Sequence, residues 1–338
     1  MAEADPKGTD RPEGMESQMA GLYWWGPGTL FGCPLVPDAR GVDIALVGLP
    51  HSGGNGTTER DQHLGPRAVR NVSSYYRRTH RTFGIDPWRE WTIRDVGDSP
   101  IPHMLDNDLA IEEMEQFLSG SVIAHGARPV SVGGDHSVTL AILRALTKPP
   151  AVDRGISLLH LDAHLDTYEA RADWYGVRCS AAHWAAIAVH EGAVDPGRSV
   201  QLGKRGHLGA YAGGHLPDLG YRVVDKDEFD QLGVQATVNL IRDRVGDNPL
   251  YISVDLDVLD PSIAPAVANP EAGEDGMTMN DVVGVLRGLR GINVVGGDVA
   301  CLVPTKDTAN NLTSLRASGI MFEQICLVAE ALKSRKAP

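Results

Sequence analysis

Acidic and imidazole side chains collect in three short segments, each of which follows an apolar stretch. The segments read GGDHS at 133–137, DAHLD at 162–166 and DLD at 255–257. Carboxylates and imidazoles gathered in this way would repel one another if no cation lay between them. Mn²⁺, Ni²⁺, Fe²⁺ or Zn²⁺ suits this mixture of oxygen and nitrogen ligands better than Ca²⁺ does. The pattern therefore predicts a site for a pair of divalent cations.

The spacing within two of the segments would turn their side chains toward a common point. Residues two apart in extended chain face the same side. Asp162, His164 and Asp166 can therefore converge, and so can Asp255 and Asp257. Two cations about 3.5–4 Å apart can share a water molecule and lower its pKa, which supplies a nucleophile at neutral pH. A single Asp-x-Asp is commonly a solvated loop, but three such segments in one chain favour the metal site.

The segments that must position these residues alternate between strand and helix patterns. Strands are predicted at 42–50, 91–98, 128–134, 156–162, 199–204, 221–225, 250–260 and 293–300, and helices at 65–76, 109–126, 137–147, 180–192, 278–289 and about 314–333. This alternation predicts a mostly parallel sheet covered on both faces, that is, a single three-layer α/β/α domain. Sites in open parallel sheets form at the carboxyl ends of the strands, where all three segments fall.

The chain divides into a tail, an arm and one large domain. Residues 1–20 are polar and acidic and are predicted to form a mobile tail. Residues 21–40 carry Trp24 and Trp25 among Gly and Pro, which predicts an irregular arm that covers either a partner subunit or its own core. Residues 41–338 form the predicted catalytic domain.

Composition excludes several classes of partner. The formal net charge of −13 argues against nucleic acid or an anionic membrane surface, and the sequence contains no apolar run of membrane-spanning length. The four cysteines form no C-x-x-C pair, which is typical of reduced thiols in a cytosol. We therefore expect a cytoplasmic protein.

The three ligand segments together resemble the metal signatures of the ureohydrolases, the arginase and agmatinase family. The resemblance runs from about Asp43 to the C-terminus and includes the segments VDIALVGLP and GGDV. It implies an α/β/α fold, two divalent ions (Mn²⁺ or Ni²⁺) and a trimer or hexamer built from identical or related chains. It also implies hydrolysis of the guanidinium C–N bond of a small cationic substrate, which releases urea and an amine.

The resemblance assigns six metal-ligand positions, all of which match in this sequence. The first ion would be held by His136, Asp162, Asp166 and Asp255. The second would be held by Asp162, His164, Asp255 and Asp257. Asp162 and Asp255 would bridge the two ions, and Asp166 would lie beside the attacking water, which makes it a candidate proton donor.

The substrate side departs from the family pattern. The family's His-Gly pair is replaced by Ala181-Ala182, so the following His183 is either a substitute for proton transfer or only a helix-face residue. In the family's V-E-V-x-P segment, Cys301 replaces the Glu that pairs with the guanidinium. The family's G-T-x-P segment becomes Ala268-Asn269-Pro270, followed by Glu271.

These departures leave several substrates open. Loss of a carboxylate that pairs with a cation costs on the order of several kcal/mol in recognition. Either Glu271 replaces it, or Asn269, Cys301 and Trp184 line a pocket for a substituted guanidine or biguanide, as in the metal-bearing chain of the metformin hydrolases that this sequence resembles. An agmatinase or guanidino-acid hydrolase is the alternative enzyme. A non-catalytic metal-bearing subunit of a hetero-oligomer is the alternative of another class.

Overall fold

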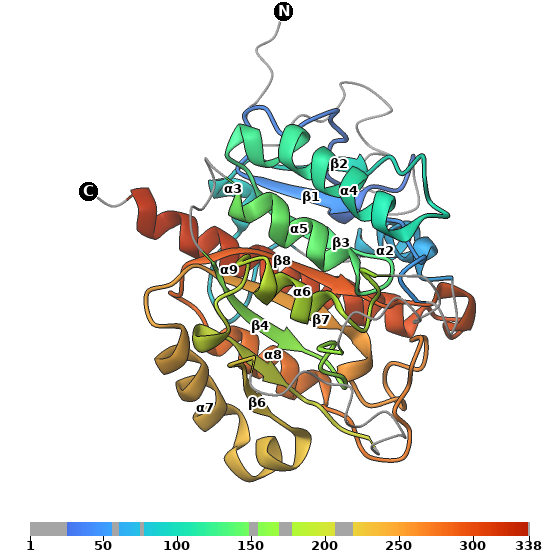
Figure 1. Ribbon diagram of the computed structural model, residues 1–338. Helices are drawn as coiled ribbons and strands as arrows, with labels where there is room; N and C mark the ends of the chain where they lie inside the picture. The colour runs from blue at the N-terminus through green and yellow to red at the C-terminus, as the bar shows by residue number, and fades with distance from the viewer. Residues whose placement is uncertain are drawn as a thin grey trace, which may run out of the picture.

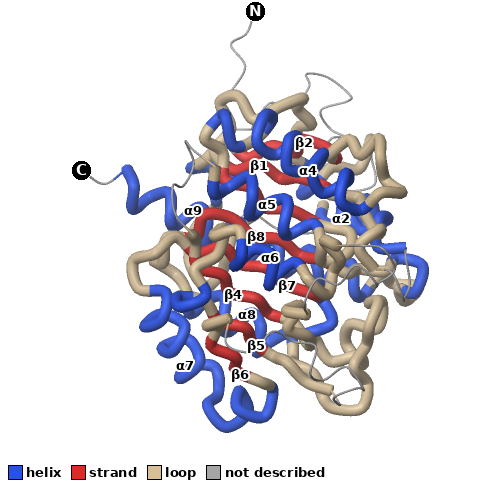
Figure 2. The backbone as a smooth tube through the Cα atoms, in the orientation of Figure 1, coloured by secondary structure: helices blue, strands red, loops and turns tan. Residues whose placement is uncertain are grey.

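One eight-stranded parallel sheet forms the centre of the molecule, as Figures 1 and 2 show. The computed structural model describes residues 26–55, 61–74, 78–148, 155–168, 178–206 and 219–336. The strands are β1 (Ile44–Gly48), β2 (Ile93–Asp98), β3 (Arg128–Val132), β4 (Ser157–Leu161), β5 (Val200–Leu202), β6 (Arg222–Val224), β7 (Leu250–Asp255) and β8 (Val294–Ala300). They lie in the order β2-β1-β3-β8-β7-β4-β5-β6. The predicted α/β fold with a parallel sheet is confirmed.

Helices cover both faces of this sheet. They are α2 (Gly65–Ser73), α3 (Pro87–Glu90), α4 (Asn107–Ser121), α5 (Val138–Thr147), α6 (Trp184–His190), α7 (Lys226–Val245), α8 (Met279–Gly288) and α9 (Leu312–Lys336). Short 3-10 turns are η1 (Leu30–Gly32), η2 (Asp61–Leu64), η3 (Ile123–His125), η4 (Pro196–Arg198), η6 (Leu256–Val258) and η7 (Pro304–Lys306). Within the described ranges, no helix combines the length and apolarity needed to cross a bilayer.

Two hydrophobic cores lie on opposite sides of the sheet. One core holds apolar side chains of α4, α5 and α6, and the other holds those of α2, α7, α8 and α9. Strand β1, the second strand from one edge, contributes to both, because Ile44 and Leu46 lie in one core and Ala45 and Val47 in the other. Successive side chains of a strand point to opposite faces of the sheet. A strand buried on both faces is therefore apolar along its whole length.

Helix α7 was missing from the sequence prediction. The Asp225 carboxylate accepts a hydrogen bond from the Glu228 N–H at 2.8 Å and so starts the helix. Gly233 then interrupts it with a φ of 70°, and the buried apolar residues before and after this break do not follow one continuous helical period. A kinked helix with many charged residues gives only a weak periodic signal.

The described part of the predicted arm lies against the chain's own core. Leu30 and Phe31 are buried, and their N–H groups donate to Asp95 Oδ2 and Ser73 Oγ at 2.8 and 2.9 Å. The predicted tail, residues 1–20, and both Trp24 and Trp25 lie outside the described residues.

The strand order brings the three ligand segments to one place. They follow β3, β4 and β7, and in the sheet β3, β8, β7 and β4 are consecutive neighbours. All neighbouring strands here are parallel, so their carboxyl ends share one edge. Close backbone packing then fixes the GGDHS loop, because the Asp135 N–H donates to the His51 carbonyl oxygen at 2.9 Å.

Gly134 has no room for a side chain, which gives a first testable prediction. A Cβ there would overlap the carbonyl oxygen of His51, which is fixed backbone. We expect Gly134→Ala to lower the free energy of unfolding by about 3 kcal/mol, as overpacking of this kind does. Thermal unfolding followed by circular dichroism measures it. Gly120→Ala is the control, because a Cβ there meets nothing within 4 Å and should leave stability unchanged or slightly higher.

Candidate metal centre

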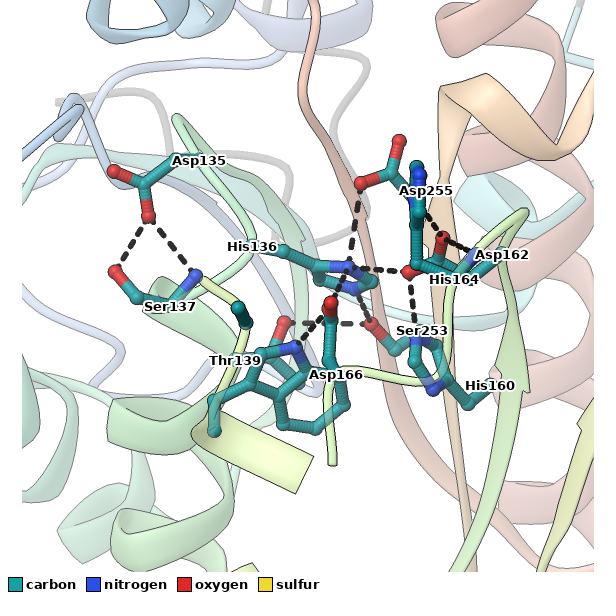
Figure 3. A network of polar contacts seen from close by, with 12 residues as sticks. Asp135, His136, Ser137, Thr139, His160, Asp162, His164, Asp166, Ser253 and Asp255 are labelled. Carbon is teal, nitrogen blue, oxygen red and sulfur yellow. Dashed lines mark hydrogen bonds and ion pairs between the residues drawn. The ribbon is translucent and has the colours of Figure 1, made fainter. Parts of the chain in front are cut away.

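Three aspartates surround the imidazole of His136. Its Nδ1 lies 2.9 Å from Asp162 Oδ2, 3.1 Å from Asp166 Oδ2 and 3.3 Å from Asp255 Oδ2. Figure 3 shows these side chains pointing toward one another from the ends of different strands. The side chains are at most 11% exposed. The first group of predicted ligands is therefore brought together in the interior.

His164 forms the second half of the cluster. Its Nδ1 lies 3.1 Å from Asp257 Oδ2 and 3.3 Å from Asp162 Oδ1. Asp162 thus turns one oxygen toward each imidazole, with Oδ2 near His136 and Oδ1 near His164. A carboxylate placed in this way is suited to lie between two cations.

A hydrogen-bond chain fixes the tautomer of His136. Ser253 Oγ donates to Asp298 Oδ1 at 3.0 Å, so the same oxygen accepts from His136 Nε2 at 2.8 Å. Nε2 therefore holds its proton, and Nδ1 is the nitrogen that can take either a second proton or a cation. That nitrogen is fully buried, and no hydrogen bond reaches it from the described part of the chain. A buried imidazole nitrogen that faces three carboxylates fits a divalent cation, which would take the place of the proton, because imidazole and carboxylate are its ordinary ligands.

The protonation equilibria show how strongly this site attracts positive charge. Burial opposes the charged form of His136, yet the nearby carboxylates of Asp162, Asp166 and Asp255 outweigh it and raise the pKa of His136 well above its usual value. Burial, together with the charges of Asp255 and Asp162, raises the pKa of Asp257 well above the usual value. Excess negative charge held away from water has both effects.

The predicted convergence has a different geometric origin from the one that the spacing suggested. Strand β4 ends at Leu161, and the His164 N–H donates to Asp162 Oδ1 at 2.6 Å, which makes a turn. Asp166 then has a φ of 52°, in the left-handed region. The DAHLD segment is therefore a loop rather than extended chain. Similarly, β7 ends at Asp255, and Asp257 lies in the turn η6.

His160 belongs to the site and was missing from the prediction. Its Nε2 lies 2.7 Å from Asp162 Oδ2. Gln201 Nε2 donates to His160 Nδ1 at 3.0 Å, so the proton lies on Nε2 and His160 donates to Asp162 rather than offering a lone pair. The sequence did contain a signal, because His160 lies two residues before Asp162 at the end of the strand and so faces the same way.

Trp184 differs from the expectation that it lines a substrate pocket. It has no exposed surface, and its Nε1–H donates to Asp166 Oδ2 at 2.7 Å. The indole also packs against the rings of His136 and His160, with centroids 4.8 and 4.9 Å away. Its position supports the cluster and orients the Asp166 carboxylate.

His183 lies at the residue that precedes α6 and is fully buried. Its Nδ1 lies 2.9 Å from Ser180 Oγ and 3.1 Å from the Arg178 carbonyl oxygen, and burial lowers its pKa. It is not among the candidate ligand groups that the described residues form. These contacts are typical of a residue that organises the start of a helix.

The remaining substrate-side residues differ in how closely they approach the cluster. His164 Nε2 lies 3.1 Å from Glu271 Oε1, and this hydrogen bond lowers the pKa of Glu271. Asn269 is half-buried in the same loop. Cys301 is 5% exposed, and its sulfur lies within 4.8 Å of candidate ligand atoms of His136 and Asp255. Glu271 therefore contacts a predicted metal ligand, and the thiol lies beside the first half of the cluster.

Fold and cluster together define an α/β protein with a candidate two-ion metal centre at the carboxyl edge of its sheet. A sequence model of the Arginase family matches residues 42–326. Guanidinopropionase from Pseudomonas aeruginosa is 38% identical and covers 90% of this chain and 92% of its own. Mitochondrial agmatinase from Gallus gallus is 33% identical over 87% of this chain and 84% of its own.

A solved structure agrees with these sequence relatives. Proclavaminate amidinohydrolase from Streptomyces clavuligerus superposes with a TM-score of 0.82 at 34% identity, covering 91% of this chain and 99% of that one. The chain belongs to the arginase family, and it is a ureohydrolase that acts on C–N bonds. The resemblance seen in the sequence is confirmed.

The indole of Trp184 supplies a second testable prediction. Trp184→Phe keeps most of the packing but removes the N–H that orients Asp166. Loss of such a supporting hydrogen bond typically weakens metal affinity about 10- to 100-fold. Competition with a chromophoric chelator measures it. The control is Trp88→Phe. The Nε1 of Trp88 lies 3.1 Å from Cys33 Sγ, which is not a residue of the cluster, so this variant should keep full metal affinity. Unchanged affinity in a folded Trp184→Phe protein would contradict the prediction.

Proposed function

We propose that this chain hydrolyses a linear guanidino compound, breaking one C–N bond with water to give urea and a primary amine. The observation that carries the proposal is Asp162, whose two oxygens face the Nδ1 atoms of His136 and His164 separately. The relatives support the substrate class, since their names include guanidinopropionase, guanidinobutyrase and agmatinase.

Six residues would hold two divalent ions, either Mn²⁺ or Ni²⁺. They are His136, Asp162, Asp166 and Asp255 on one side, and Asp162, His164, Asp255 and Asp257 on the other. When bound, such ions lower the pKa of water and polarise the bond to be broken. The chain's own groups then orient the reactants and move protons.

Asp166 is the proposed proton carrier. It lies in the cluster, and Trp184 occupies its Oδ2, which leaves Oδ1 as the oxygen that can take a proton from water and pass it to the departing amine. His183 is the second candidate named by the sequence, but its described contacts are with Ser180 and the Arg178 carbonyl group. The geometry therefore favours Asp166.

Exposure indicates the side from which the substrate arrives. The side chains of His164 and Glu271 are 32% and 35% exposed, whereas those of the other cluster residues are at most 11% exposed. We infer that the guanidinium group enters past His164. Glu271 Oε1 already accepts from His164, so Oε2 is the oxygen that would pair with the cation. This arrangement favours a guanidino acid or agmatine, for which a single carboxylate partner suffices.

A substituted guanidine or a biguanide such as metformin is the second candidate. It is favoured by one observation, the buried thiol of Cys301 where the family pattern has a carboxylate. We also predict that the chain assembles as a trimer or hexamer, alone or with a related chain, and that it is cytoplasmic. A non-catalytic metal-bearing subunit is the alternative of another class.

Urea release separates these functions. The purified chain, loaded with Mn²⁺ or Ni²⁺, is incubated with guanidinopropionate, guanidinobutyrate, agmatine and metformin. We expect at least one linear compound to be cleaved with a kcat/KM about tenfold or more above that for metformin, which corresponds to about 1.4 kcal/mol of transition-state preference. Cleavage of metformin alone, detected as urea or as dimethylamine with guanylurea, would instead favour the biguanide. No amine or urea from any of them, with metal bound, would favour the non-catalytic subunit.

Removal of the shared carboxylate tests the centre itself. Asp162→Asn removes the charge that faces both imidazoles, so we expect both ions to be lost and kcat to fall about 1,000-fold or more. Elemental analysis gives the metal content and a coupled urea assay gives the rate. The matched control is Asp38→Asn, since Asp38 makes a surface ion pair with Arg40. Full metal content in Asp162→Asn would refute the assignment.

A further inference from the structure

We propose that the sulfur of Cys301 is itself a ligand of the ion held by His136 and Asp255. The inference rests on the proposed metal centre and adds a seventh protein ligand to the six that the family pattern assigns. It gives this position, to which the family resemblance assigns a carboxylate for the substrate, a role in binding metal instead.

The sheet places Cys301 between the two residues that it would join. It directly follows β8, and β8 lies between β3 and β7, whose ends lead to His136 and Asp255. The Cys301 N–H donates to the Gly134 carbonyl oxygen at 2.7 Å, which ties the residue to the GGDHS loop. All three side chains are buried, and their candidate ligand atoms lie within 4.8 Å of one another.

This span agrees with coordination of one ion. Nitrogen and oxygen ligands lie about 2.0–2.2 Å from ions such as Zn²⁺ and sulfur about 2.3 Å, so two ligands of one ion are at most about 4.5 Å apart. Small side-chain movements of a few tenths of an ångström therefore suffice. The thiol gives up its proton to solvent as the metal–sulfur bond forms.

The backbone at Cys301 is held in an unusual conformation. Its φ is 66°, in the left-handed region that a non-glycine residue rarely adopts. The hydrogen bond to Gly134 and the burial of the side chain maintain it. Strained residues of this kind concentrate at functional sites, and here the turn ends the strand beside the cluster.

A second, independent observation points to an ion at the same place. The Nδ1 atom of His136 is buried and makes no hydrogen bond with the described part of the chain, while Nε2 is taken up by Ser253. Nδ1 faces the space that Asp255 and Cys301 also border. A cation there would satisfy the nitrogen, the carboxylate and the sulfur together.

A sulfur ligand changes which metals the centre prefers. Thiolate favours softer ions, and carboxylate and water favour Mn²⁺. We therefore expect Cys301 to raise the affinity for Ni²⁺, Co²⁺ or Zn²⁺ relative to Mn²⁺. Substitution by Ser, which offers oxygen instead, should lower the ratio of Ni²⁺ to Mn²⁺ affinity about tenfold or more. Loss of even one supporting group around a metal typically changes affinity by about this much.

Cobalt provides a direct spectroscopic test on the full chain. Co²⁺-loaded protein should show a sulfur-to-cobalt charge-transfer band in the near ultraviolet that is lost in Cys301→Ser and in Cys301→Ala. The control is Cys326→Ser, because Cys326 is fully buried in α9 and belongs to no candidate metal group of the described residues. It should keep the band. Nickel-edge X-ray absorption of the unmodified chain should show sulfur in the first coordination shell, a measurement that needs no variant to fold.

The outcomes separate this inference from the proposed function. Cobalt that binds with carboxylate and imidazole features but without the band, and nickel without a sulfur neighbour, would refute the Cys301 ligand and leave the metal centre intact. An unmodified chain that binds neither ion would overturn both. Retention of the band in a folded Cys301→Ser protein would also refute the assignment.

Discussion

Four aspartates and two histidines face one another at one edge of the sheet, and all of them except His164 are buried. This concentration of negative charge is the constraint on which the rest of the structure depends. Asp162 lies at its centre, with one oxygen toward each imidazole. Carboxylates so placed repel one another unless positive charge lies between them. The strand order β3-β8-β7-β4 produces this concentration, since it brings the ends of four neighbouring strands to one edge of the sheet.

A second layer of side chains holds each ligand in a defined orientation. Ser253 fixes the proton of His136, Gln201 fixes that of His160, and Trp184 donates to Asp166. These groups are almost entirely buried, so their hydrogen bonds are strong, and any unpaired atom among them would be costly. The layer therefore prepares the cluster for a cation before one binds.

The two halves of the cluster differ in their access to water. The half around His136 is closed, and it is the half that Cys301 borders. The half around His164 is partly open, and there Glu271 supplies a carboxylate at the rim. The closed side therefore matches the proposed ion site, and the open side matches the proposed entry of the guanidinium group.

Local patterns in the sequence determined the strands, the single α/β/α domain and the set of groups that meet at its edge, because apolar runs and residue spacing are properties of one segment. They did not predict α7, whose period Gly233 interrupts, nor the loop geometry that places Asp166, which depends on a left-handed φ. Tertiary structure alone decided that Trp184 is buried beneath the cluster, that His160 donates to Asp162, and that Cys301 lies beside His136. Each of these contacts depends on the order of the strands and on the direction of hydrogen bonds between distant segments. The residue spacing within a single segment does not determine either of them.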